Sequence, residues 1–191
     1  MILNQDYDFM RDAPQGVKDA FKSPPRKVLL RVGQKLYRIL TPAGVAEIRS
    51  KAWVDSLKPD PNEVGQWWMT QKTFKHLVEV SKRQGTGLSD VVRAQLAISQ
   101  DFSKTMNALC IIRMKRDMYA FEGIAAPQPL AKESPNVLLM GNADQVWIPQ
   151  MAWNDVFLER FLNSFEPIIL SDLSPNLTVT LAELLQAQRK K

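Results

Sequence analysis

The chain has 191 residues, of which 45% are hydrophobic and 24% are charged. This composition is typical of one globular domain and excludes a disordered chain. The longest apolar runs, 108–112 and 137–140, are far shorter than the roughly 20 residues that a membrane span needs. The single cysteine, Cys110, excludes an intrachain disulfide and a cysteine-based metal cluster, so we expect a cytoplasmic protein without a bound metal.

The net charge of +5 and the pI of about 9.4 favour anionic partners, nucleic acids among them. An excess this small fits a solvated basic surface at least as well. An aliphatic segment is interrupted by three basic residues, Arg113, Lys115 and Arg116. They indicate either a solvated strand edge or a strip that follows the phosphates of a nucleic acid. The solvated edge is the favoured interpretation.

The first half of the chain alternates short strands and helices. Pro14 opens a short helix, and Ser23-Pro24-Pro25 separates this lead-in from the main domain. The Gly33 connection is typical of a tight turn between two strands. The elements expected in this half are strands at 28–31 and 35–40, a helix at 44–51, a loop at 58–61, a strand end at 65–70 and a helix at 73–81.

The second half starts with a helix over 90–98, for which Ser89 is the expected N-cap. Aliphatic and aromatic residues then predict strands at 108–114, 118–121, 137–140 and 145–148. The pattern returns to helical spacing over 155–164, and Thr180 and Glu183 form a capping box for a last helix.

These elements predict an α+β fold. We expect a helical lead-in over 1–26, the main domain over 27–153 and a helical C-terminal appendage over 154–191.

Three segments resemble motifs of the ADP-ribosyltransferase-like toxin superfamily, which includes an NAD-glycohydrolase branch. They are Leu36-Tyr37-Arg38 on an early strand, the aromatic segment 65–70 and the late segment 141–149. The resemblance covers about 28–150. It implies a split β-sheet core with flanking helices, and NAD as the substrate of an intracellular bacterial toxin or defence effector. It further implies a macromolecular acceptor, protein or nucleic acid, and an antitoxin or immunity protein that grips 154–191.

The resemblance also assigns roles to five residues. Arg38 would clamp the pyrophosphate, for which a guanidinium supplies a planar fork of donors. Trp67 or Trp68 would form a wall for nicotinamide, and Thr70 would brace the neighbouring strand. Gln145 would stand at the position of the catalytic Glu or Gln and orient the ribose while positive charge develops on it.

The sequence departs from the better-known branches, which place a glutamate where this chain has Gln145. An amide carries no negative charge and takes no proton. Either Gln145 suffices, or Asp144 or Glu122 assists it.

Each assignment has a structural alternative. Arg38 could face solvent, with Arg31 as a lesser candidate for the clamp. One of the two tryptophans is expected in the core because neighbours on a strand face opposite ways. Thr70 could be a helix cap, and Gln145 a polar residue after a turn. His76, the only histidine, is expected to be structural or on the surface.

Three functions therefore stand beside one another. The leading prediction is an NAD-dependent ADP-ribosyltransferase that modifies a macromolecule. The second is an NAD glycohydrolase of the same fold, with water as the acceptor. The third, from another class, is a non-catalytic basic protein that binds a nucleic acid or a partner protein.

Overall fold

The computed structural model describes residues 2–41, 66–101, 106, 108–114, 117–149 and 165–170. Its mixture of helices with a mostly antiparallel sheet confirms the predicted α+β class. No helix in this part of the chain is long and apolar enough to cross a membrane. The helix expected at 44–51, the loop at 58–61 and the last helix from Thr180 lie outside the described residues.

Four helices are described: α1 (Phe9–Asp12), α2 (Gln15–Asp19), α5 (Gln71–Gln84) and α6 (Leu88–Gln95). The strands are β1 (Arg26–Leu30), β2 (Lys35–Leu40), β3 (Trp67–Thr70), β4 (Ala108–Met114), β5 (Met118–Ile124), β6 (Gln128–Pro129), β7 (Leu138–Leu139), β8 (Asp144–Trp147) and β9 (Phe165–Leu170). The strands predicted early in the chain are confirmed, whereas the segment predicted as one strand over 137–140 contributes only a short β7 paired with β6.

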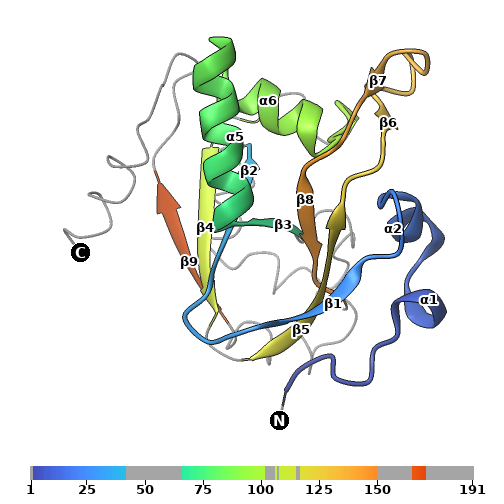
Figure 1. The fold of residues 1–191 in the computed structure, drawn as a ribbon, viewed down its shortest axis with the longest axis vertical. Coiled ribbons are helices and arrows are strands. Elements are labelled where there is room, and N and C mark those ends of the chain that lie inside the picture. Colours follow the sequence, from blue (N-terminus) through green and yellow to red (C-terminus); the bar gives the residue numbers. More distant parts are fainter. Residues whose placement is uncertain are drawn as a thin grey trace.

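The main sheet consists of two halves that β3 joins. Its strand order is β1-β5-β8-β3-β2-β4-β9, with antiparallel pairing throughout. Trp67 and Trp68 of β3 pair with β8, whereas Met69 and Thr70 pair with β2. Figure 1 shows β3 running between the β1-β5-β8 half and the β2-β4-β9 half. A four-residue strand therefore fixes how the two halves face each other.

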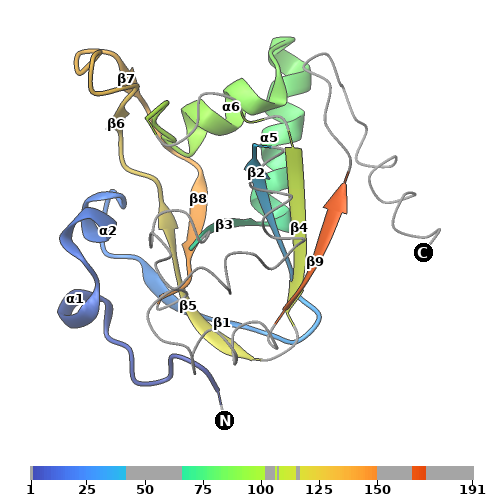
Figure 2. The ribbon, with the colours of Figure 1, turned by 180° about the vertical axis from the view of Figure 1, so that it is seen from behind.

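The two faces of this sheet have different environments. We call the face that carries Leu36 and Val146 the inner face, because side chains from both halves meet there in one buried cluster. The members of that cluster are Leu3, Leu30, Leu36, Trp68, Met114, Met118, Ala120, Val146 and Ile148. The opposite, outer face is covered by helices. Figures 1 and 2 show α5 and α6 beside the β2-β4 half, and α1 and α2 beside the β1-β5-β8 half.

Helix α5 begins directly after β3. The Thr70 side chain accepts a hydrogen bond from the backbone N–H of Thr73 over 3.2 Å, so Thr70 is the N-cap, one of the alternatives expected for it.

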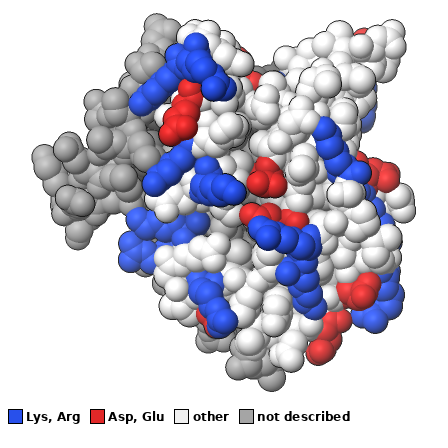
Figure 3. All heavy atoms as spheres, viewed as in Figure 1, with Lys and Arg blue, Asp and Glu red and all other residues white. Residues whose placement is uncertain are grey.

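The predicted N-cap at Ser89 is wrong. Helix α6 starts two residues earlier than predicted, at Leu88 after the N-cap Gly87, and the Ser89 hydroxyl donates to the Met106 carbonyl instead. Lys and Arg side chains gather over the solvent side of α5 (Figure 3).

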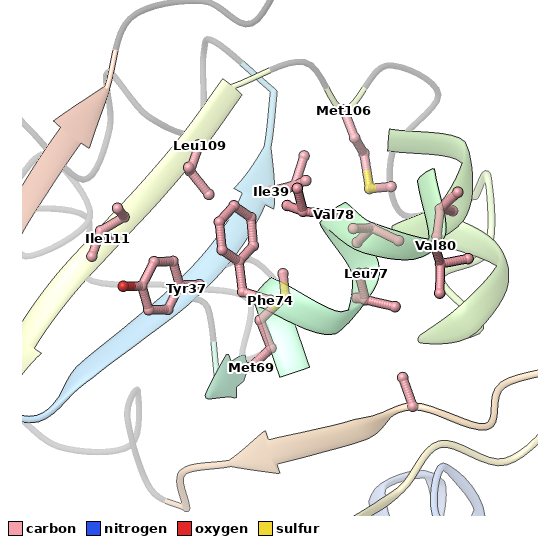
Figure 4. Close-up of a cluster of buried hydrophobic side chains, with 13 residues drawn as sticks. Tyr37, Ile39, Met69, Phe74, Leu77, Val78, Val80, Met106, Leu109 and Ile111 are labelled. Carbon is pink, nitrogen blue, oxygen red and sulfur yellow. The ribbon is translucent and has the colours of Figure 1, made fainter. Parts of the chain in front are cut away.

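The apolar side of α5 packs on the outer face of β2 and β3. Tyr37 of β2 stacks on Phe74 of α5, with 4.7 Å between ring centroids and 12° between ring planes. Figure 4 shows these rings with Met69, Leu77 and other buried side chains between the helix and the strands. This packing holds the start of α5, and therefore Thr70, at a fixed position beside the sheet.

Strand β9 corrects the expectation of a wholly helical C-terminal appendage. Phe165–Leu170 forms a strand that pairs with β4 along its whole length, from Leu109↔Leu170 to Met114↔Phe165. Pro167 disfavours a helix across this segment, and the edge of β4 offers it six residues of backbone pairing. The rest of 154–191 lies outside the described residues.

We predict that Gly141, just before β8, tolerates no side chain. Its φ is +69°, and a Cβ there would lie 2.2 Å from the Ala125 carbonyl oxygen. Gly85, at the end of α5, has a similar φ of +63° but open space around it. Gly85→Ala should cost about 1 kcal/mol, the penalty of the left-handed conformation alone, and Gly141→Ala distinctly more. Urea unfolding measures both, and equal losses would contradict the steric explanation.

Candidate functional site

Arg38 and Trp68 lie together on the inner face of the sheet. Tyr37 of β2 is opposite Met69 of β3, so the next positions, Arg38 and Trp68, are neighbours that project from the other side. The guanidinium carbon of Arg38 lies 5.9 Å from the centre of the Trp68 ring, within the range of a cation–π contact. Trp68 is only 3% exposed whereas Arg38 is half-buried, so the indole supports the guanidinium from below.

Thr70 ends β3 on the same face as Trp68. It is opposite Leu36, whose side chain belongs to the inner cluster. Its hydroxyl caps α5 and lies 3.1 Å from the hydroxyl of Thr73. Thr70 is half-buried, so it is held by the helix while part of its surface remains accessible.

Asp144, the first residue of β8, also belongs to the inner face. Val146 of β8 is opposite Trp68 and lies in the inner cluster, and Asp144 is two residues before it. Residues two apart on a strand project from the same side. The Asp144 side chain therefore lies on the inner face, diagonal to Trp68. The Asp144 side chain is half-buried.

Glu122 of β5 adds a second carboxylate to the inner face. It is opposite Val146, and therefore diagonal to Asp144. The Arg26 guanidinium binds it through Nε and Nη2, at 3.1 and 2.5 Å from Oε2. This bond and the charges of Glu122 and Asp144 raise the pKa of Arg26. Of the two carboxylates, Glu122 receives the hydrogen bonds of the Arg26 guanidinium. Asp144 interacts with Arg26 only through its charge.

The structure does not bring Gln145 to Arg38 and Thr70. Gln145 is 7% exposed, and it lies on the outer face, on the same side as Trp147. Its Nε2 donates to the Ala20 carbonyl oxygen, at the end of α2, over 2.8 Å. The expectation that these three residues share one site is therefore wrong, because strand alternation turns Gln145 and Asp144 to opposite faces. Gln145 connects the N-terminal lead-in to the sheet.

Trp67 is on the outer face with Gln145. Its ring packs beside Phe21 and Trp147, with centroid separations of 5.4 and 6.4 Å. The expectation that one of the two tryptophans is a core residue is confirmed for Trp68, which is buried in the inner cluster. Trp67 is half-buried and packs against the outer cluster, and the buried Trp68 ring forms no open wall for a ligand.

The remaining candidates lie away from this face or are held elsewhere. His76 is exposed on α5, as expected of a surface residue. Arg31 forms an ion pair with Asp117 over 2.9 Å. Arg113 is exposed, but β4 is not an edge strand because β9 pairs with it; Lys115 and Arg116 lie outside the described residues. Among the described residues, no three His, Cys, Asp or Glu side chains come together as metal ligands.

The inner face therefore combines an arginine, a hydroxyl and a carboxylate on three adjacent strands: Arg38 on β2, Thr70 on β3 and Asp144 on β8. A guanidinium binds phosphate oxygens, and a carboxylate stabilises positive charge on a substrate. Arg26 was not predicted as a site residue, because its only signal in the sequence is a basic residue at the first position of a strand.

No protein-family model matches the chain, and no curated protein sequence matches it. Two solved structures are similar in fold. The first is Rhs1-CT in complex with its cognate immunity protein RhsI1, at 12% sequence identity and a TM-score of 0.44, covering 78% of this chain and 82% of that one. The second is Tne2 in complex with Tni2, at 11% identity and a TM-score of 0.46, covering 78% of this chain and 94% of that one.

We predict that Gln145 contributes to stability through its bond to Ala20. Gln145→Leu removes one of two donors to the Ala20 carbonyl oxygen, because the backbone N–H of Ala126 also donates to it, so the free energy of unfolding should fall by about 1 kcal/mol. Gln128→Leu is the matched control, because Gln128 donates to the neighbouring Asp19 carbonyl over 3.4 Å in an exposed position. That change should cost under about 0.5 kcal/mol. Similar losses in urea unfolding would refute a specific role for Gln145.

Proposed function

We propose that the chain is an NAD-consuming enzyme that transfers ADP-ribose to a macromolecule, with its active site on the inner face of the sheet. The observation that carries this proposal is the shared face of Arg38, Thr70 and Asp144 on adjacent central strands. Two of these residues are those that the resemblance to ADP-ribosyltransferase-like toxins assigns to NAD. The third supplies the negative charge that Gln145 lacks.

Arg38 is proposed to bind the pyrophosphate of NAD. The guanidinium stays charged at any working pH, and its planar fork matches two phosphate oxygens. Trp68 acts as a positioning residue, because its buried ring lies under the guanidinium carbon at 5.9 Å and restricts the side chain to the inner face. The hydroxyl of Thr70, fixed by the start of α5, lies on the same side and orients the ligand next to Asp144.

Asp144 is proposed as the catalytic residue. The bond between the ribose C1′ and the nicotinamide nitrogen breaks, and its electron pair leaves with nicotinamide, which departs as a neutral molecule. Positive charge then develops on the ribose, and a fixed carboxylate in a half-buried position stabilises it. A nucleophilic atom of the acceptor bonds to C1′ and releases its proton. Arg26 neutralises Glu122, so this second carboxylate adds little negative charge beside Asp144.

We predict that Asp144→Asn abolishes NAD cleavage, with a loss of about 100-fold or more, since loss of one group that stabilises transition-state charge costs about 10²–10³ in rate. The change keeps the shape of the side chain, so unfolding in urea should be nearly unchanged. The assay incubates the purified protein with NAD labelled in the adenylate and with cell lysate. Released nicotinamide is measured by chromatography, and label is counted in the protein and nucleic-acid fractions.

Gln145→Leu is the control, because the neighbouring residue faces away from the site. It should lower stability but keep NAD cleavage within a few-fold at a temperature where it is folded. Inactivity of a folded Gln145→Leu together with activity of Asp144→Asn would overturn the assignment. Nicotinamide release without macromolecular label would show that water is the acceptor and that the enzyme is a glycohydrolase. No NAD turnover by the unmodified chain would refute the proposed function.

A further inference from the structure

A basic strip runs along the solvent side of α5 and continues onto β2 and β4. On α5 it consists of Lys72, Lys75, Lys82 and Arg83, all exposed and all on one side of the helix, while the opposite side is buried. Figure 3 shows Lys and Arg side chains gathered over this helix and below it. At 1.5 Å per residue, the 14 residues of α5 extend over about 20 Å.

The lower end of the strip meets a cavity. Its volume is about 430 Å³, and it is lined by Gly33, Gln34, Lys35, Thr70, Gln71 and Lys72. Two lysines from different elements therefore border one hollow. Lys35 is also directly opposite Arg113 of β4, and like charges in that position destabilise a sheet. Burial, and then the charge of Arg113, lower the pKa of Lys35.

On the α5 part of the strip, exposed cations outnumber acidic residues. The ion pairs Arg11–Asp12, Arg26–Glu122 and Arg31–Asp117 do not include the four cations of α5. Glu79 is the acidic residue within the α5 surface, and Glu166 is in register with Arg113 on β9. The Thr70 side chain already caps the first turn of α5, so the charge of the cavity comes from the lysines.

From this arrangement we propose that the basic strip and its cavity bind the phosphate backbone of a nucleic acid. A nucleic acid carries a regular line of negative charges, one for about every 3.4 Å of helix axis in each strand of a duplex, which suits cations that recur along α5. Lys72 and Lys75 follow each other at about 4.5 Å of helical rise. The cavity accommodates one phosphate group between Lys35 and Lys72.

The chemistry of the strip favours a nucleic acid over other anionic partners. Protein interfaces need buried aromatic or aliphatic contacts at their centre, and membrane-surface helices need an apolar side that enters the lipid. The exposed side of α5 carries only polar and charged residues. The exposed large hydrophobic residues of the described chain, such as Leu138 and Met140, are on other elements.

The test measures binding by fluorescence anisotropy without NAD, so its result is independent of the proposed enzyme activity. Probes are a labelled 20-nucleotide single-stranded RNA and a labelled 20-base-pair DNA duplex. Lys72→Gln/Lys75→Gln/Lys82→Gln is compared with the control Lys18→Gln/Lys22→Gln/Lys132→Gln. Each triple variant lowers the net charge from +5 to +2, because three positive charges are removed.

The strip variant should bind at least about tenfold more weakly than the unmodified chain, while the control should stay within about threefold. Three lost phosphate contacts should also reduce the slope of log affinity against log salt by about 3 on duplex and about 2 on a single strand. Equal weakening of both variants, or no binding by the unmodified chain, would overturn the proposal. Displacement of the probes by polyglutamate of equal charge would also overturn it, in favour of an acidic protein partner.

Discussion

The whole structure depends on how β3 divides its backbone hydrogen bonds. Two of its residues pair with β8 and the next two pair with β2, so the two halves of the sheet are joined only through short pairings. This short connection lets the two inner faces turn toward each other and share the cluster around Leu36 and Val146. The same four residues bring β2, β3 and β8 side by side, and these strands carry Arg38, Thr70 and Asp144 on the inner face.

Much of the fold follows from local sequence patterns, and the position of the site does not. The segments around Tyr37 and Ile111 have the alternation and β-branched content of strands, and Phe74 and Leu77 have helical spacing, so these elements were predictable. Pairing between distant strands is not encoded locally. The strand at 165–170 was not predicted as an element, because its pairing partner β4 is distant in the sequence.

The faces of the strands explain the error at Gln145. A shift of one residue along a strand moves a side chain to the other face, and a motif read from sequence does not fix that parity. The residues that fix it are Val146 and Trp147, which enter different clusters, one with Trp68 and the other with Phe9 and Phe121. Once these large side chains are buried on opposite faces, Gln145 must lie on the outer face, toward α2, and Asp144 on the inner face with Arg38.

This division also explains why a polar residue as buried as Gln145 persists outside the proposed site. The N-terminal lead-in contributes Phe9 and Phe21 to the outer cluster, and the end of α2 brings the Ala20 carbonyl oxygen over β8. The Ala20 carbonyl oxygen accepts from the backbone N–H of Ala126 and also from the Gln145 amide, which adds no charge to an apolar face. A glutamate there would accept rather than donate at neutral pH, so the second of these hydrogen bonds would be lost. An amide at 145 and a carboxylate at 144 are therefore each suited to the face on which alternation puts them.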